Sequence, residues 1–154
     1  MDIRSMQDDT PDLEAFFPYR LAIAAENFSR NLLDVYGREF GLSREEWRLI
    51  YLLAREEQIT SLELSNRTTL DRVQVSRASQ RLEDKGLITR SVAPEDRRLR
   101  LYACTDQGRA LFQAIFPKVQ ARTKEVLDRM TPEGRTALND GLKALSDAMN
   151  ERPV

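Results

Sequence analysis

The chain carries its clearest structural pattern between Thr60 and Thr105, in the sequence TSLELSNRTTLDRVQVSRASQRLEDKGLITRSVAPEDRRLRLYACT. Thr60 and Glu63 have the spacing of a capping box, in which each side chain satisfies a backbone N–H group at the start of a helix. The short helix that they open is expected to stop near the β-branched pair Thr68–Thr69, which favours a turn. A second helix is expected to start directly after this turn, with Asp71 as its N-cap.

This second helix is expected to end near residue 85, because Gly86 readily adopts the positive φ typical of a helix C-terminus. Residues 87–92 then alternate between apolar and polar side chains, residues 93–96 have turn chemistry, and residues 99–104 alternate again. The stretch therefore predicts two helices joined by a short turn and followed by a β-hairpin with a basic tip. This order is typical of a winged helix-turn-helix.

Helical periodicity continues on both sides of this stretch. Pro18, a favourable first helical residue, precedes a long amphipathic helix, and Ser43 with Glu46 forms a capping box for a second helix. After the hairpin, two more amphipathic helices are expected, the first of them kinked at Pro117. The fold class predicted for residues 1–154 is a single, mainly α-helical domain with a small β-hairpin wing.

Histidine is absent, and Cys104 is the only cysteine in the 154 residues. This composition excludes an internal disulfide and a multi-thiolate zinc site, and it removes the most common metal ligand and general base. The carboxylates are scattered over helix faces and caps, so no catalytic residue, metal or cofactor is expected. No apolar run reaches the roughly 18 residues of a membrane span, and the acidic N-terminus does not resemble a signal peptide, so a cytoplasmic protein without membrane contact is expected.

Charge is distributed unevenly along a chain whose net charge is only −1. Between Arg67 and Arg100 there are nine basic and five acidic residues, so this segment carries +4 and the remainder −5. The basic segment coincides with the expected helix-turn-helix and hairpin. A double-stranded DNA partner is therefore indicated by where the charges lie, although the total charge does not suggest one.

Helical spacing divides the second helix of the motif into two faces. One face consists of Val75, Ala78, Ser79 and Leu82. The opposite face suits base edges in the major groove, because Arg77 can donate two hydrogen bonds to a guanine and Gln80 can pair with an adenine. Ser76 can contact a base or a phosphate, and Val73 can pack on a thymine methyl group.

An ordinary solvated helix face is the alternative interpretation of these side chains. The arginines of the hairpin tip favour DNA, because arginines on a protruding loop reach into a narrow minor groove. A winged protein-interaction module without DNA binding would instead be expected to carry neutral residues there. The expected DNA-binding residues are Thr68, Thr69, Arg72, Val73, Gln74, Ser76, Arg77, Gln80, Arg81, Asp96, Arg97, Arg98 and Arg100.

Several of these residues together resemble the MarR family of transcriptional regulators. The resemblance rests on Leu70–Arg77, on Leu82–Ile88 with Arg90, on Asp96–Arg98 and on Cys104–Gly108. It implies a homodimer whose terminal helices interlock and whose two winged parts bind a pseudo-palindromic operator. It also implies that Asp96 orients Arg98 for the minor groove. Cys104 departs from the family pattern, which usually has leucine there.

The resemblance also accounts for the apolar stripes on the flanking helices, which otherwise would form an intramolecular helical core. It assigns residues 43–104 to the winged DNA-binding part and residues 12–42 and 105–150 to dimerisation helices. A two-fold dimer would place its two recognition helices about one DNA turn apart, roughly 34–36 Å.

A small-molecule effector is also expected near the junction of the first two helices, where the sequence is rich in aromatic residues and has two guanidinium groups. The expected ligand-binding residues are Phe16, Tyr19, Arg20, Ile23, Asn27, Trp47, Arg48 and Tyr51. Aromatic walls with a few polar groups suit a carboxylate-bearing aromatic ligand. Alternatively, Trp47 and Ile23 belong to the core, and Arg20 and Arg48 form salt bridges or face water.

Residues Phe17–Leu21 and Glu46–Arg48 resemble the branch of the family associated with catabolism of aromatic acids, so an aromatic acid or its thioester is the expected effector, and relief of repression the expected response. Thiol sensing through Cys104 is the alternative. It is disfavoured because thiol-sensing relatives place the reactive cysteine near the N-terminus, and a lone cysteine on a strand is usually an inert small apolar residue.

Overall fold

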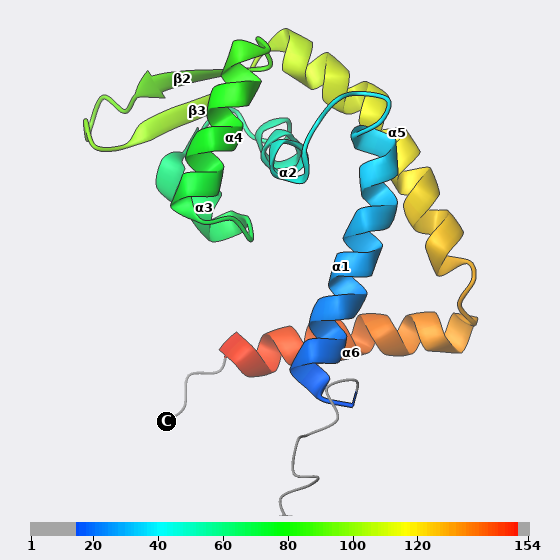
Figure 1. The fold of residues 1–154 in the computed structure, drawn as a ribbon. Coiled ribbons are helices and arrows are strands. Elements are labelled where there is room, and N and C mark those ends of the chain that lie inside the picture. The colour runs from blue at the N-terminus through cyan, green and yellow to red at the C-terminus, as the bar shows by residue number, and fades with distance from the viewer. Residues whose placement is uncertain (1–14, 151–154) are drawn as a thin grey trace, which may run out of the picture.

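The computed structural model describes residues 15–150, so the first residues of the expected 12–42 segment lie outside the described range. The described part is mainly helical, with one small antiparallel sheet (Figure 1). Its elements are α1 (Phe17–Tyr36), α2 (Arg44–Leu53), β1 (Ile59–Thr60), α3 (Ser61–Arg67), α4 (Arg72–Asp84), β2 (Ile88–Val92), β3 (Arg100–Cys104), α5 (Asp106–Leu127) and α6 (Pro132–Asn150). The mainly α-helical fold with a wing is thus confirmed.

The predicted helix starts are confirmed by their hydrogen bonds. The capping box at α2 joins the Ser43 N–H to Glu46 Oε2 over 2.7 Å, and the box at α3 joins the Thr60 N–H to Glu63 Oε2 over 2.9 Å. Asp71 caps α4 as expected. These caps set where each helix of the motif begins, and therefore which of its residues face the core.

The sheet has three strands in the order β1-β3-β2, one more than the predicted hairpin. β1 has only two residues, too few for an alternating pattern, and it is recognised only by its pairing of Ile59 with Tyr102. In β3 the side chains of Tyr102 and Cys104 are buried, while those of Leu101 and Ala103 are partly exposed. Tyr102 and Cys104 therefore lie on the side of β3 that faces the core.

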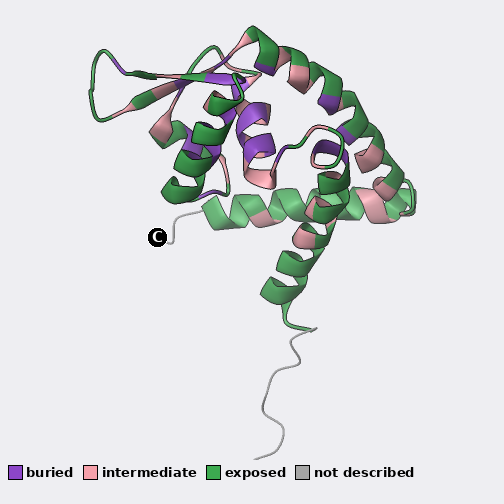
Figure 2. Ribbon diagram, turned by 45° about the horizontal axis from the view of Figure 1, so that its top comes forward, coloured by how far each residue is buried: buried purple, intermediate pink, exposed green. Residues whose placement is uncertain are grey.

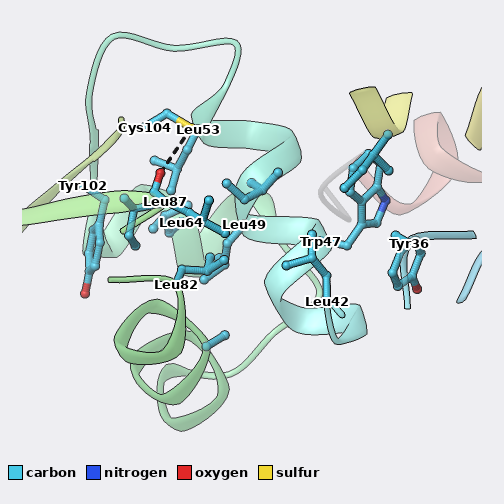
Figure 3. Packing of buried hydrophobic residues seen from close by; sticks show 14 of the residues in the cluster. Tyr36, Leu42, Trp47, Leu49, Leu53, Leu64, Leu82, Leu87, Tyr102 and Cys104 are labelled. Carbon is cyan, nitrogen blue, oxygen red and sulfur yellow. Dashed lines mark hydrogen bonds between the residues drawn. The ribbon is translucent and has the colours of Figure 1, made fainter. Parts of the chain in front are cut away.

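The hydrophobic core is centred where α2, α3, α4 and the sheet meet, and it extends to the C-terminal end of α1 and to Ile115 and Val119 of α5 (Figure 2). Leu49, Leu53, Leu64 and Leu82 each have 0% of their surface exposed, and Figure 3 shows them packed together beside Leu87. Burial of apolar surface on this scale is the main favourable contribution to folding. The recognition helix is thus held against a dry, closed core.

The flanking helices α1, α5 and α6 are much more exposed (Figure 2). In α1 only Val35 and Tyr36, at its C-terminal end, are buried, and α6 contains no buried residue. Pro117 lies inside α5 without ending it, although Figure 1 shows that the helix bows along its length. We call α1, α5 and α6 together the helical frame.

Candidate nucleic-acid interface

Helix α4 has the two faces that its sequence predicts. Val75, Ala78, Ser79 and Leu82 are buried, and Val73, Ser76, Arg77 and Gln80 are exposed. Val73 has 56% of its surface exposed. The outward face is therefore available to a partner molecule, and it combines a guanidinium, an amide, a hydroxyl and an apolar group.

The C-terminal half of α4 is anchored to α2 through Glu46, which is only 2% exposed. Its Oε1 accepts hydrogen bonds from Lys85 Nζ at 3.0 Å and from Arg81 Nε at 3.3 Å. Lys85 also donates to the carbonyl of Gly41 at 3.0 Å. Arg81, an expected DNA-binding residue, is thus engaged inside the protein, although it remains half-exposed. The sequence showed Glu46 only as a helix cap and gave no sign of these long-range partners.

Gln74, at the start of α4, also has an internal partner. Its Oε1 accepts from the Asp71 N–H at 3.0 Å while Asp71 Oδ1 accepts from the Gln74 N–H at 2.8 Å, a reciprocal capping box. The sequence analysis identified Asp71 as the cap but assigned Gln74 to DNA. In the structure the amide of Gln74 stabilises the helix start.

Arg72 and Ser76 of α4, with Arg98 of the wing, line a hollow of about 380 Å³ that also borders α3. This shared hollow shows that the outward face of α4 and the wing lie next to each other. Two guanidinium groups and the hydroxyl of Ser76 converge there, which is a suitable environment for an anionic group. The expected major-groove and minor-groove elements therefore belong to one continuous surface.

The wing loop is shaped by Asp96, whose Oδ1 accepts from the backbone N–H of Arg98 at 2.9 Å. Asp96 therefore acts on the backbone at Arg98, a typical Asx-turn, and no contact with the Arg98 guanidinium is recorded in the described residues. Arg97, Arg98 and Arg100 are all exposed. The wing thus presents three cationic side chains to solvent.

The turn between α3 and α4 contains Thr68 and Thr69, which behave differently. The Thr68 hydroxyl donates to the carbonyl of Leu64 at 2.7 Å and so closes α3. Thr69 is exposed, and its hydroxyl accepts a hydrogen bond from Nη1 of Arg48 on α2. Arg48, expected to bind a ligand, therefore contacts a residue expected to bind DNA.

Wing strand β2 is tied to α4 by Arg90. Its guanidinium pairs with the carboxylate of Glu83, and its Nη2 donates to Oε1 of Gln80 at 2.5 Å. Hydrogen bonding to Glu83 raises the pKa of Arg90 above its already high ordinary value, so the guanidinium stays charged. Arg90 carried the family resemblance but was not among the expected DNA-binding residues.

The expected ligand residues fall into separate places within this chain. Trp47, Arg48 and Tyr51 line a groove of about 730 Å³, which we call the α2–α5 groove. Tyr19, Arg20, Ile23 and Asn27 line a different, open depression of about 620 Å³ on α1. Phe16 lines neither of them and is 52% exposed. A single site formed by all eight residues is therefore not present within one chain.

Three aromatic side chains, those of Trp47, Tyr51 and Phe116, are among the residues that line the α2–α5 groove. Trp47 is stacked between Tyr36, with ring centroids 5.5 Å apart, and Phe112, at 5.8 Å, and the stack continues to Phe116. Trp47 is buried as the core alternative states, whereas Ile23, at 42% exposure, is not a core residue in this chain. Phe116 lies on the amphipathic helix expected after the hairpin, and the sequence carries no signal that this residue lines a groove.

Four basic side chains also border the groove, from α2, α3, α5 and the start of α6. They are Arg48, Arg67, Lys124 and Arg135. Arg67 pairs with Glu56, and Arg135 pairs with Asp128, whose pKa is held below its usual range mainly by Lys124. Of these four only Arg48 was expected from the sequence, because the others are brought together by the packing of separate helices.

Cys104 is buried, and Figure 3 shows its thiol directed at the carbonyl of Leu87, with the sulfur and oxygen 3.7 Å apart. Burial raises the pKa of this thiol, so the reactive thiolate is disfavoured at neutral pH. The interpretation of Cys104 as a small core residue is therefore favoured.

Within residues 15–150 no group of His, Cys, Asp and Glu side chains could hold a metal ion, and none of the helices has the length and apolar character of a membrane span.

Fold and surface together define a winged helix-turn-helix protein. Residues 40–99 match the sequence model of the MarR family. The chain is also 31% identical over 110 residues to YdgJ, an uncharacterised HTH-type transcriptional regulator of Bacillus subtilis strain 168, covering 71% of this chain and 67% of that one. The chain belongs to the MarR family of transcriptional regulators and is therefore not an enzyme.

Solved structures agree with this assignment. Sco3205, a MarR family regulator from Streptomyces coelicolor solved in complex with DNA, has a TM-score of 0.76 and 25% identity, covering 87% of this chain and 86% of that one. Bordetella bronchiseptica BpsR, the subject of a structural study of regulation of DNA binding by 6-hydroxynicotinic acid, has a TM-score of 0.76 and 22% identity, with 87% and 95% covered. The likeness to BpsR supports the fold alone.

Proposed function

We propose that this protein is a homodimeric repressor that binds a pseudo-palindromic DNA operator and is released from it by a small anionic aromatic ligand. The observation that carries the proposal is the continuous surface on which Arg72 and Ser76 of α4 share a hollow with Arg98 of the wing. Arg77 lies exposed on the same helix. Such a surface presents base-reading groups to a major groove and arginines to the neighbouring minor groove.

Unpartnered apolar side chains on the helical frame support the homodimer. Leu21 and Ile23 on α1, and Leu138, Leu142 and Met149 on α6, are between 36% and 70% exposed. Water-exposed leucines in such numbers are typical of an interface, and a second copy offers the same faces in a two-fold arrangement. In such a dimer the partner would cover the α1 depression that Tyr19 and Arg20 line.

The α2–α5 groove supports control by a ligand. A carboxylate placed among its aromatic rings would share the groove with the guanidinium of Arg48. Arg48 contacts Thr69 in the turn before α4. A ligand that draws Arg48 away from Thr69 would favour a dimer geometry in which the recognition helices are misplaced. Its effect is limited by its difference in affinity between the two geometries.

DNA binding is tested by fluorescence anisotropy with the promoter adjoining the gene for this protein. We expect sequence-specific binding that weakens steeply with salt, because phosphate contacts release counterions. Arg77→Ala should cost about 1–3 kcal/mol on the operator and relax the base preference, whereas Arg38→Ala, far from the interface, should change nothing. Absence of specific binding by the intact protein, or an equal loss on operator and random DNA for Arg77→Ala, would contradict this function.

Dimerisation and ligand control need separate measurements. Light scattering should give the mass of two chains, and Leu142→Asp should shift it towards one. A thermal-shift screen of aromatic acids and their thioesters should find a stabilising compound that also lowers DNA affinity, and Arg48→Ala should abolish both effects. A monomer at micromolar concentration, or a ligand response unchanged in Arg48→Ala, would contradict these two parts of the proposal.

The thiol-sensing alternative predicts DNA release by peroxide that is lost in Cys104→Ser. The burial of Cys104 disfavours it, and we expect the wild-type protein to keep its DNA affinity in peroxide. A peroxide response that requires Cys104 would reverse this preference.

A further inference from the structure

Gln80 lies on the exposed face of α4, yet its side-chain amide has an internal partner at each of its two polar atoms. Its Oε1 accepts from Arg90 Nη2 at 2.5 Å, and its Nε2 donates to Asp84 Oδ1 at 2.9 Å. Arg90 reaches it from wing strand β2, which packs beside α4 (Figure 1), and Asp84 lies one helical turn further along α4. Partners from two elements therefore hold this exposed amide.

These partners fix which way the amide faces. A guanidinium only donates and a carboxylate only accepts, so the oxygen must face Arg90 and the nitrogen must face Asp84. An amide that is free in solvent interconverts between two orientations, because the terminal torsion of glutamine is roughly two-fold, and only one orientation matches a given base edge. In Gln80 the orientation is set before any DNA arrives.

The internal partners also leave the groups that a base needs. An amide oxygen accepts two hydrogen bonds and an amide nitrogen donates two, so after Arg90 and Asp84 are satisfied, Gln80 keeps one acceptor and one donor. One acceptor and one donor on the same amide are the pair that matches N6 and N7 of adenine in the major groove. The number of donors and acceptors on Gln80 is therefore sufficient for adenine and for both internal hydrogen bonds together.

Arg90 is itself held in place. Its guanidinium pairs with Glu83, and both side chains are partly shielded, with 27% and 38% of their side-chain surfaces exposed. Gln80 and Glu83 are three residues apart on α4 and so lie on the same side of the helix. The Arg90 guanidinium, with its planar fork of donors, bridges both of them at once, which the point charge of a lysine cannot do equally well.

We propose that Arg90 is a specificity-determining residue that acts through Gln80: it contacts no base, and it holds the Gln80 amide in the orientation that selects adenine at one position of each half-site. The inference rests on the proposed function, because it requires that α4 enters a major groove. It assigns to the wing a role in base selection in addition to its expected contacts in the minor groove.

The test is a double-mutant cycle read out base by base. The wild-type full-length protein first selects its operator from a random DNA pool, and this step alone tests the proposed function. Affinities are then measured for operators with each base replaced in turn, using wild type, Gln80→Ala, Arg90→Lys and the double variant. Arg90→Lys keeps a positive charge beside Glu83 and so protects the fold, and melting curves verify that each variant is folded.

We expect Gln80→Ala to lose about tenfold discrimination at one adenine per half-site, the usual size for a bidentate base contact. Arg90→Lys should lose part of the discrimination at that same position and none elsewhere. In the Gln80→Ala background, Arg90→Lys should have no further effect, because its target is gone. Gln80→Glu should shift the preference at this position towards cytosine, whose N4 group donates to a carboxylate.

Three outcomes would overturn the inference while leaving the proposed function intact. The first is a wild-type base preference in folded Gln80→Ala, which would make Gln80 only a link between wing and helix. The second is an Arg90→Lys effect that persists undiminished in the Gln80→Ala background. The third is a uniform loss over all operator variants in Arg90→Lys, which indicates a general effect of charge or of wing position. Failure of the wild-type protein to select any operator counts against the proposed function itself.

Discussion

The winged helix-turn-helix and the helical frame belong to one chain but bury their apolar side chains to different extents. In the winged part, Leu49, Ile50 and Leu82 are entirely buried, in a core that Ile115 of α5 also enters. In the frame, α6 has no buried residue, and the apolar stripe of α1 is buried only at its end near Val35 and Tyr36. The difference teaches that the winged part buries most of its apolar side chains within this chain, partly against Ile115 and Val119 of α5, whereas α1 and α6 have apolar surface left to bury.

A rigid unit attached to an incompletely buried frame suggests where regulation acts. The winged part can change its conformation only by losing packing in its core. The helices of the frame have fewer contacts within the chain, so they can move against a partner with fewer contacts to break. The proposed ligand therefore needs to shift the position of α4, and it does not need to remodel the helix. Arg48, between the α2–α5 groove and Thr69, lies where such a shift would begin.

Leu82→Ala should cause the largest loss of stability. The side chain is fully buried, so the substitution is expected to cost about 2–5 kcal/mol, and the cost should not depend on protein concentration. Leu142→Ala, on the exposed stripe of α6, should instead cost less as the protein is diluted, because its contacts belong to the proposed dimer and are absent once the subunits separate. Urea unfolding followed by circular dichroism at two concentrations distinguishes them. Equal concentration dependence for both variants would remove the distinction between the two regions.

Gly108→Ala should be the next most damaging change. A Cβ atom there would lie 2.1 Å from the Leu87 carbonyl oxygen and 2.8 Å from the Cys104 sulfur, so the start of α5 would have to move, at a cost of about 1–3 kcal/mol. Gly141→Ala in α6 is the matched control. Nothing lies within 4 Å of its added Cβ, and alanine favours helix by about 1 kcal/mol. Thermal denaturation should therefore show opposite signs, and a shared sign would contradict the comparison.

Glu46→Gln should have a moderate effect. The nearly buried carboxylate holds both Lys85 and Arg81, and removal of its charge is expected to cost about 1–2 kcal/mol, since its two partners are half-exposed. Glu39→Gln breaks the exposed pair with Lys118 and should cost less than about 1 kcal/mol. Chemical denaturation measures both. A larger loss for Glu39→Gln would mean that α4 does not depend on the Glu46 anchor.

The smallest effect is expected at Glu26 and should appear as a pH dependence. Arg44 donates two hydrogen bonds of 2.8 Å to this carboxylate and holds its pKa below the ordinary value of 4.5. A lowered pKa in the folded state adds stability that is present above pH 4.5 and is lost as the pH falls through the lowered value. The stability difference between wild type and Glu26→Gln should therefore vanish in acid. A difference that stays constant down to pH 3 (roughly one unit below the usual glutamate pKa) would contradict this.

Local signals in the sequence were sufficient for most of the winged part. The capping residues Ser43, Thr60 and Asp71 marked the helix starts, because a cap acts within three residues of itself. Helical spacing likewise separated the buried Leu82 from the exposed Arg77. Strand β1 was missed, because two residues carry no periodicity and its structure exists only through pairing with β3.

The candidate site was predicted less completely, because its side chains depend on partners distant in sequence. Arg81 was assigned to DNA without any sign that Glu46, on another helix, holds it. Arg90 was passed over because its contacts with Gln80 and Glu83 require strand β2 to return beside α4. The expected ligand residues were divided between two surfaces, since the direction of α1 away from α2 is set by packing and not by helical periodicity.

Sequence alone established the order of the elements from Thr60 to Thr105, the outward face of α4 and the local positive charge of this segment. These properties follow from capping, helical repeat and residue type, which act over a few residues along the chain. Tertiary structure decided which polar side chains of that face are held by others, as Gln80 is held by Arg90 and Asp84, and which apolar stripes stay uncovered. Hydrogen bonds and burial between separate elements depend on how the chain returns upon itself, and a one-dimensional pattern does not contain that information.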